Sequence, residues 1–187
     1  MPIKKKWSIV AVVIVAIASM VFMAGCGGSK SESASSTASG GSEVKETAKE
    51  TVAESNVKGN IYETEKFSIL LPDGWETTDL EPGVLIKPSN EEDRFIMVQV
   101  NRNNVTEAEI KAEVEELIKT KPAFAPLTEV TMLGIKFFKI SGIAENGSEQ
   151  TAYAGVRNGE KVAIVMGGKD HQNDKTLKAM LESIKFK

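Results

Sequence analysis

The chain has 187 residues, of which 23 are lysine or arginine and 26 are aspartate or glutamate, and its formal net charge is −3. With 41% hydrophobic and 26% charged residues, the composition is that of a globular protein and excludes collagen-like, wholly disordered and multi-span membrane proteins. A single cysteine and a single histidine exclude a disulfide scaffold, a cysteine-cluster zinc site and any chemistry that needs two thiols or two imidazoles.

Charge and polarity divide the chain into three segments. Residues 1–25 carry a charge of +3, residues 26–56 carry −2 and residues 57–187 carry −4. Binding to nucleic acid requires a basic excess that neutralises phosphates, and neither of the last two segments has one. We therefore expect no nucleic-acid partner.

Residues 1–25 have the pattern of a secretory signal peptide. Lys4–Lys6 form a basic start, and an apolar run follows that reaches Ala24. The stretch from Trp7 to Ala24 is also just long enough to cross a bilayer as a retained anchor, which is the alternative. The residues at the end of this apolar run distinguish a cleaved signal peptide from a retained anchor.

Met23-Ala24-Gly25-Cys26 resembles the lipobox of bacterial lipoprotein signals, in which an apolar residue and two small residues precede a cysteine, although leucine is commoner than methionine at the first position. The resemblance implies that the Cys26 thiol receives a diacylglycerol, that a peptidase cuts before Cys26, and that the new amine is then open to acylation, with palmitate as a typical chain. Two or three chains anchor a protein stably, since each buried methylene contributes about 0.8 kcal/mol. We therefore predict lipidation at Cys26 and attachment to the outer face of the cell membrane.

Residues 26–56 are too polar to build a core. Serine, glycine, lysine and glutamate dominate, and Val44 and Val52 alone make no apolar stripe. We expect a disordered tether, and about thirty flexible residues have a root-mean-square reach of roughly 30 Å. A Ser/Gly-rich tether behind a lipobox resembles the arrangement in Gram-positive lipoproteins.

Residues 57–187 carry the periodic apolar segments and are expected to fold as one domain. Pro72-Asp73-Gly74 reads as a turn, Thr106 and Glu109 form a capping box, and Asn146-Gly147 and Asn158-Gly159 predict two-residue hairpin turns with positive φ. The predicted strands are 61–63, 67–71, 84–87, 95–101, 127–133, 135–142, 148–156 and 161–166, and the predicted helices are a first one between Thr106 and Pro122 and a closing one over 173–184.

Runs of strands separated by single helices predict an α+β fold with an antiparallel β-sheet covered by helices. The strand Phe95–Asn101 is apolar on both faces and is expected to be central. Ala152, Ala154 and Gly155 are small enough for a helix to approach the sheet closely.

The domain resembles the PsbP/Mog-type superfamily, including its DcrB-like lipoprotein branch. Three stretches carry the resemblance: Phe67–Trp75, the hairpin series after the first helix, and the terminal segment Met180–Phe186. The resemblance covers most of residues 60–187. It implies the fold of that superfamily, whose members are mostly non-enzymatic assembly factors, adaptors and envelope lipoproteins, and it transfers no functional residue.

Two motifs near the closing helix suggest chemistry that ordinary structure explains better. Met166-Gly167-Gly168-Lys169 faintly resembles a phosphate loop, but the upstream glycine is missing and Asp170 stands where serine or threonine would bind magnesium. His171 could pair with Asp170 or Asp174, but no serine sits in a strained turn to act as nucleophile. We expect a strand-to-helix turn in which His171 is exposed and mobile.

Other candidates also have structural explanations. The acidic stretches Glu91-Glu92-Asp93 and Glu113-Glu115-Glu116 lack the spacing of a calcium loop and predict solvated charge. Asn104 and Asn146 match glycosylation acceptors, which helix capping and a hairpin turn explain. Trp75 either plugs the end of the sheet or presents an aromatic platform to a partner, and the first is favoured.

The sequence therefore predicts a lipid-anchored extracytoplasmic protein whose domain binds or assembles other components, with no catalytic residue, cofactor or metal site. Its partners would be membrane lipid, through Cys26, and an envelope protein or small ligand that the sequence does not name. The alternatives are a small extracytoplasmic enzyme or metal-dependent factor that uses carboxylates, and an accessory solute-binding lipoprotein.

Overall fold

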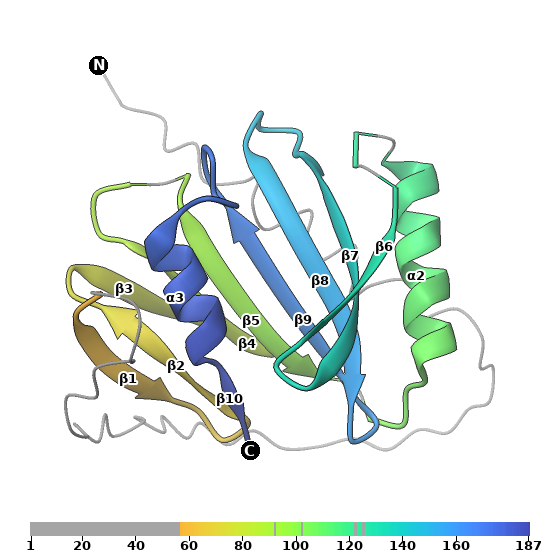
Figure 1. Ribbon diagram of the computed structural model, residues 1–187, viewed down its shortest axis with the longest axis horizontal. Helices are drawn as coiled ribbons and strands as arrows, with labels where there is room; N and C mark the ends of the chain where they lie inside the picture. The colour runs from red at the N-terminus through yellow and green to blue at the C-terminus, as the bar shows by residue number, and fades with distance from the viewer. Residues whose placement is uncertain (1–56, 92, 102, 122, 125) are drawn as a thin grey trace, which may run out of the picture. The chain divides into compact units, whose positions relative to one another are not determined.

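The computed structural model describes residues 57–91, 93–101, 103–121, 123–124 and 126–187 (Figure 1). In chain order, the elements in these residues are β1 (Gly59–Glu63), β2 (Phe67–Pro72), β3 (Trp75–Leu80), β4 (Gly83–Pro88), β5 (Phe95–Asn101), α2 (Glu107–Thr120), β6 (Thr128–Met132), β7 (Ile135–Ile143), β8 (Glu149–Arg157), β9 (Glu160–Gly167), α3 (Lys175–Ser183) and β10 (Lys185–Phe186).

The strands form two antiparallel sheets. The large sheet has seven strands in the order β3-β4-β5-β9-β8-β7-β6, and the small sheet has three in the order β1-β2-β10. In the large sheet β5 pairs with β9, so the strands before α2 join those after it through Phe95 opposite Gly167 and Asn101 opposite Lys161. Two meanders are thereby united in one sheet around β9.

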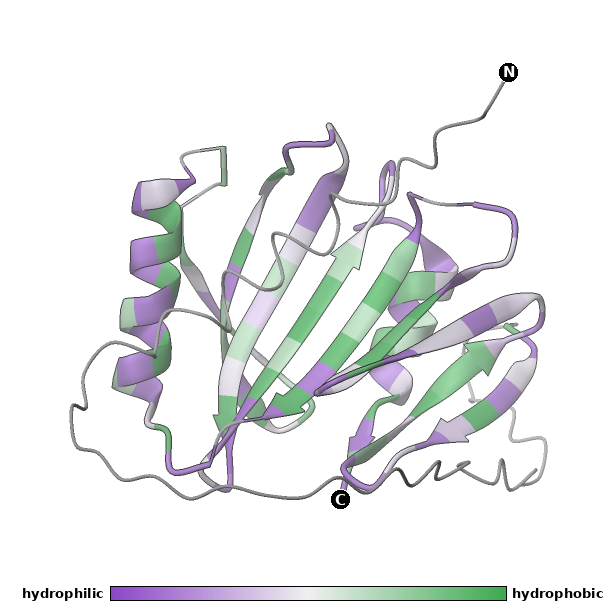
Figure 2. Ribbon diagram, turned by 180° about the vertical axis from the view of Figure 1, so that it is seen from behind, coloured by the Kyte–Doolittle hydropathy of each residue, from purple (hydrophilic) through white to green (hydrophobic). Residues whose placement is uncertain are grey.

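The core lies between one face of the large sheet and a layer made by α3 and the small sheet (Figure 1). Leu177, Met180 and Ile184 pack there against Ile96 and Ile164 from the sheet. α2 lies on the opposite face (Figure 2), where it contacts β7 and β8. Helices therefore lie on both faces of the sheet, α3 against β5 and α2 against β7 and β8, in line with the α+β prediction.

Most predicted elements are confirmed. All eight predicted strands are present, β5 has the predicted bounds, and α2 starts with the predicted capping box, in which the Glu109 backbone N–H donates to Thr106 Oγ1 (3.3 Å) and the Thr106 N–H donates to Glu109 Oε2 (2.8 Å). On α2, Ile110, Val114 and Leu117 are buried.

Two strands were not predicted, and the single sheet expected from the sequence is wrong. β3 is an edge strand of the large sheet with the polar sequence Glu76–Asp79, so it has no apolar alternation to detect. β10 has only two residues, which pair with Ser68 and Phe67 of β2. Beyond them the Leu70 N–H donates to the Ser183 hydroxyl of α3 at 2.8 Å instead of to a strand.

One of the two predicted Asn-Gly turns differs in type. Asn158 and Gly159 have φ of 52° and 78°, as the predicted two-residue turn requires. At the other turn only Gly147 has positive φ (83°), and its N–H donates to the Ala144 carbonyl at 2.8 Å. That hairpin therefore has a longer loop than predicted, because Asn146 instead uses its Oδ1 to accept from the Ser148 N–H (3.1 Å).

Gly155 is needed for a different reason from the one expected. A Cβ added at Gly155 would meet the Lys136 carbonyl oxygen at 2.7 Å and the Phe137 ring at 2.9 Å, so the neighbouring strand β7 requires the glycine and a covering helix does not. Ala152 and Ala154 pair in register with Val165 and Ala163 and lie on the strand that α2 contacts.

Gly155→Ala should lower the free energy of unfolding by about 1–3 kcal/mol, because the added methyl overpacks the β7–β8 contact. Urea denaturation measures the change. Gly134→Ala is the matched control: a Cβ there has nothing within 4 Å, and its φ of 70° alone accounts for a cost of about 1 kcal/mol. A Gly155→Ala protein as stable as the wild type would show that this register is wrong.

The two sheets are joined at their edges by a tyrosine. The Tyr62 hydroxyl of β1 donates to Asp79 Oδ1 of β3 at 2.8 Å. Burial, together with the adjacent Asp79 carboxylate, raises the pKa of Tyr62 to about 12, and burial also raises the pKa of Tyr153. Since the raised pKa favours the neutral phenol in the folded state, the contact stabilises the fold below pH ~10 and is lost as the pH rises towards about 12.

Absorbance titration of tyrosinate tests this directly, because the chain has only 2 tyrosines. Little tyrosinate should form near pH ~10 in the folded protein. Asp79→Asn should lower the pKa of Tyr62, whereas Asp73→Asn, which removes an exposed carboxylate in a nearby turn, should leave the titration unchanged. Normal titration of both tyrosines in the folded wild type would contradict the assignment.

Candidate functional site

The loop between β9 and α3, residues 168–174, holds the titratable residues that the sequence singled out. Lys169 and Asp170 are exposed, and His171 is 3% exposed. The expectation that His171 is exposed is therefore wrong. The loop folds inward at this residue, with Asp170 at a positive φ of 54° directly before it.

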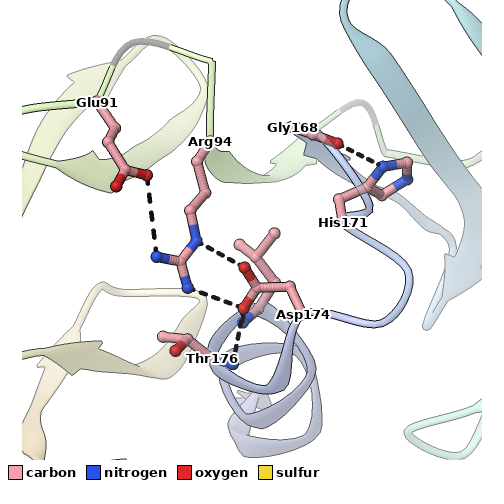
Figure 3. Close-up of polar contacts among 7 residues, drawn as sticks. Glu91, Arg94, Gly168, His171, Asp174 and Thr176 are labelled. Atoms are coloured by element: carbon pink, nitrogen blue, oxygen red, sulfur yellow. Dashed lines mark hydrogen bonds and ion pairs between the residues drawn. The ribbon is translucent and has the colours of Figure 1, made fainter.

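His171 ends a chain of hydrogen bonds from two neighbouring strands. Its Nε2 lies 2.7 Å from Thr151 Oγ1 of β8, and Thr151 Oγ1 lies 2.9 Å from Ser141 Oγ of β7. Its Nδ1 lies 3.0 Å from the Gly168 carbonyl oxygen (Figure 3). The ring thus bridges its own loop to the sheet, and because it is buried it does not face a site open to solvent.

The Asp–His pairs that the sequence suggested do not form. Asp170 Oδ1 accepts from Asn173 Nδ2 at 2.7 Å. Asp174 is the N-cap of α3, and its Oδ1 accepts from the backbone N–H groups of Thr176 (2.8 Å) and Leu177 (3.0 Å). Neither carboxylate orients the imidazole, so the arrangement that nucleophilic catalysis requires is not assembled at this loop.

Arg94, from the loop between β4 and β5, binds the Asp174 carboxylate that caps α3. Its Nη2 donates to Asp174 Oδ1 at 2.9 Å, and its Nε lies 2.7 Å from Asp174 Oδ2 (Figure 3). Its Nη1 lies 3.9 Å from Glu91, and its Cζ lies 4.9 Å from the centroid of the Trp75 ring. This two-pronged ion pair with a stacked aromatic fastens the β4–β5 loop to the start of α3.

Trp75 is half-buried and packs against the core. One part of the ring therefore closes the end of the sheet, as the favoured prediction had it, and the Arg94 guanidinium covers another part. The sequence did not indicate Arg94 or Thr151: Arg94 follows an acidic run that reads as solvated charge, and Thr151 lies in a strand with no motif that marks it.

Asp174 is the group at this loop whose ionisation responds to its surroundings. Burial would raise the pKa of Asp174, but the Arg94 guanidinium and the backbone N–H groups of Leu177 and Thr176 outweigh burial and lower it. The ionised carboxylate is therefore the form that the fold binds.

The remaining candidates are placed apart. Glu113 pairs with Lys161 at 2.7 Å and Glu116 with Lys119 at 3.3 Å, so these α2 carboxylates do not converge. In the described part of the chain no group of three or more His, Cys, Asp or Glu side chains could hold a metal ion. Gly168–Asp170 forms the start of a turn, with φ of 126° at Gly168, and Cys26 lies outside the described residues.

Neither described helix meets the length and hydropathy that a bilayer crossing demands. α2 has 14 residues and α3 has 9, and each has a polar side.

Asp174→Ala should lower the free energy of unfolding by about 0.5–2 kcal/mol near neutral pH, because the cap of α3 is lost. Since the folded state lowers the pKa of Asp174, its contribution is present above the ordinary carboxyl range of about 4 and is lost as the pH falls below it. Urea unfolding at neutral and at acid pH should show a smaller acid loss in Asp174→Asn than in the wild type. Asp170→Asn is the control, and equal acid losses in all three proteins would contradict the role given to Asp174.

The comparisons with known proteins identify the fold. No protein-family model and no curated protein matches the chain. The solution structure of cyanobacterial PsbP (CyanoP) from Synechocystis sp. PCC 6803 is similar, with a TM-score of 0.51 and 11% identity over 74% of this chain and 98% of that chain. A crystal structure from Bacteroides thetaiotaomicron VPI-5482 gives a TM-score of 0.43 and 13% identity over 65% of this chain and 45% of that chain. The CyanoP match confirms the fold expected from the resemblance, and the described domain has a PsbP-like fold.

Proposed function

We propose that the chain is an extracytoplasmic lipoprotein, anchored through acylated Cys26, whose PsbP-like domain is a non-catalytic binding or assembly module. The proposed membrane anchor is supported by the sequence Met23-Ala24-Gly25-Cys26, which ends an apolar run that follows Lys4–Lys6. The chain's single cysteine stands at the position where a lipoprotein signal would modify it.

The polar groups of the domain support a binding role over catalysis. The single imidazole of the chain, His171, is buried and bonded to Thr151 and Gly168, and Asp174 is committed to Arg94 and the helix cap. A catalytic base must reach the substrate proton, directly or through one water. These groups instead hold the loops of the domain together, which suits a rigid module that presents its surface to a partner.

Cys26→Ser should abolish lipidation and leave the precursor uncut, because the chain has no second thiol. Detergent phase separation and the mass of the N-terminal peptide measure the outcome. Adding Ser29→Cys to this variant is the matched control: it restores a thiol outside the motif and should not restore the anchor. A wild-type peptide that begins at Met1 and carries no lipid would contradict the proposal.

The binding role is tested in intact cells with a photo-crosslinking residue at Ile143, which is the large hydrophobic side chain that the described domain exposes most, at 56%. We expect a discrete crosslinked species with an envelope component, and a photo-crosslinker at the buried Leu177 should give none. The same purified protein should show no turnover in esterase, phosphatase and peptidase screens. Turnover that resists further purification would favour the carboxylate-enzyme alternative and overturn the non-catalytic role.

A further inference from the structure

The β9–α3 loop is fastened on both sides, and His171 is its buried centre. On one side the Gly168 N–H donates to the Glu149 carbonyl at 3.0 Å, and the Asp170 N–H lies 3.3 Å from Glu149 Oε2. On the other side Asp174 binds Arg94. Between them His171 packs inward onto Thr151, which is fully buried.

The hydrogen-bond partners of the His171 ring fix where each hydrogen lies in the series Ser141, Thr151, His171 and Gly168. The Gly168 carbonyl oxygen can only accept, so Nδ1 carries the imidazole hydrogen. The other nitrogen, Nε2, is then a bare acceptor in the neutral ring, and the Thr151 hydroxyl donates to it. With its hydrogen so used, Thr151 Oγ1 accepts from the Ser141 hydroxyl. The hydrogen bonds run in one direction, from Ser141 through Thr151 and His171 to Gly168.

A second proton on the ring would force this order to reverse. Nε2 would become a donor to Thr151, the Thr151 hydroxyl would have to turn towards Ser141, and the half-buried Ser141 hydroxyl would need a new acceptor. The positive charge would also be buried, and burying an ion without a partner is costly.

None of the charged groups around the loop pairs with the imidazole. They are Glu149 on β8, Lys169 and Asp170 in the loop, Asp174 at the α3 cap and Arg94 on the β4–β5 loop. Glu149 faces the Asp170 N–H, Asp170 binds Asn173 and Asp174 binds Arg94, so among the described contacts no carboxylate touches the imidazole.

We propose that His171 is a pH-operated latch: when its imidazole is protonated, the Gly168–Asn173 loop detaches from Thr151 and the first turn of α3 loosens. The loop and the helix are coupled through the backbone, since the Asp174 N–H lies 3.3 Å from the His171 carbonyl oxygen. A histidine ring free in solvent takes up its proton between pH ~5 and ~8, so mild acidification favours the state in which the loop is detached.

Hydrogen exchange of the full chain in detergent micelles tests the latch at pH ~7 and ~5, with correction for intrinsic rates. We expect the amides of residues 168–177 to lose protection about tenfold at the lower pH and to regain it on return, while β9 stays protected. In His171→Gln this pH response should disappear. Glu149→Gln is the matched control, since it removes a carboxylate that accepts from the loop at Asp170 and should keep the response.

A measurement on the wild type keeps the test independent of whether His171→Gln folds well. Long-range ¹H–¹⁵N spectra of the single imidazole should show the Nδ1–H tautomer near neutral pH and the doubly protonated ring at the pH where the loop amides lose protection. Equal loop protection at both pH values, a response that persists in His171→Gln, or an Nε2–H tautomer would overturn the proposal. None of these outcomes depends on anchoring through Cys26, so the latch and the proposed function stand or fall separately.

Discussion

The fold depends on the burial of β9 on both of its faces. Every residue from Lys161 to Gly167 is buried, and neighbouring side chains of a strand point to opposite sides. Such a strand needs a covering layer on each side. α3 and the small sheet lie over one face, and on the other face the Lys161 end of β9 reaches α2. The Lys161 side chain is 6% exposed, and its ammonium group has Glu113 of α2 as its counter-ion at 2.7 Å, which replaces part of the solvation it gave up.

The same burial explains why the chemically suggestive loop is structural. At Gly167 the chain leaves the middle of the large sheet and must reach the start of α3, which packs over the face it has just left. Lys169 and Asp170 of this loop face solvent, but His171 turns inward, so the polar atoms of its ring must find their partners within the protein. Thr151 provides one from β8, and Arg94 on the β4–β5 loop binds Asp174. His171 and Asp174 are thus used in closing the fold.

The sequence predicted the elements that have periodic apolar patterns and failed where tertiary contacts decide. Strand Phe95–Asn101 and the Thr106 capping box were predictable because their signals are local. β3 was not, because an edge strand with one wet side can be as polar as Glu76–Asp79. The burial of His171 was not predictable either, since a histidine beside aspartates reads as surface until the partner hydroxyl, 20 residues earlier in the chain, is seen beside it.

Location and fold come from separate parts of the chain, and each limits the function in its own way. A shared fold does not imply a shared function, so the likeness to CyanoP leaves the partner of this domain open. The proposed anchor at Cys26 would add a location, because a domain tethered outside the membrane would be in direct contact with the external medium and its changes of pH. A buried histidine that holds a loop and a helix start is then sited where acidification would reach it. If both proposals hold, acidification of the medium would change the surface that the β9–α3 loop presents outside the membrane.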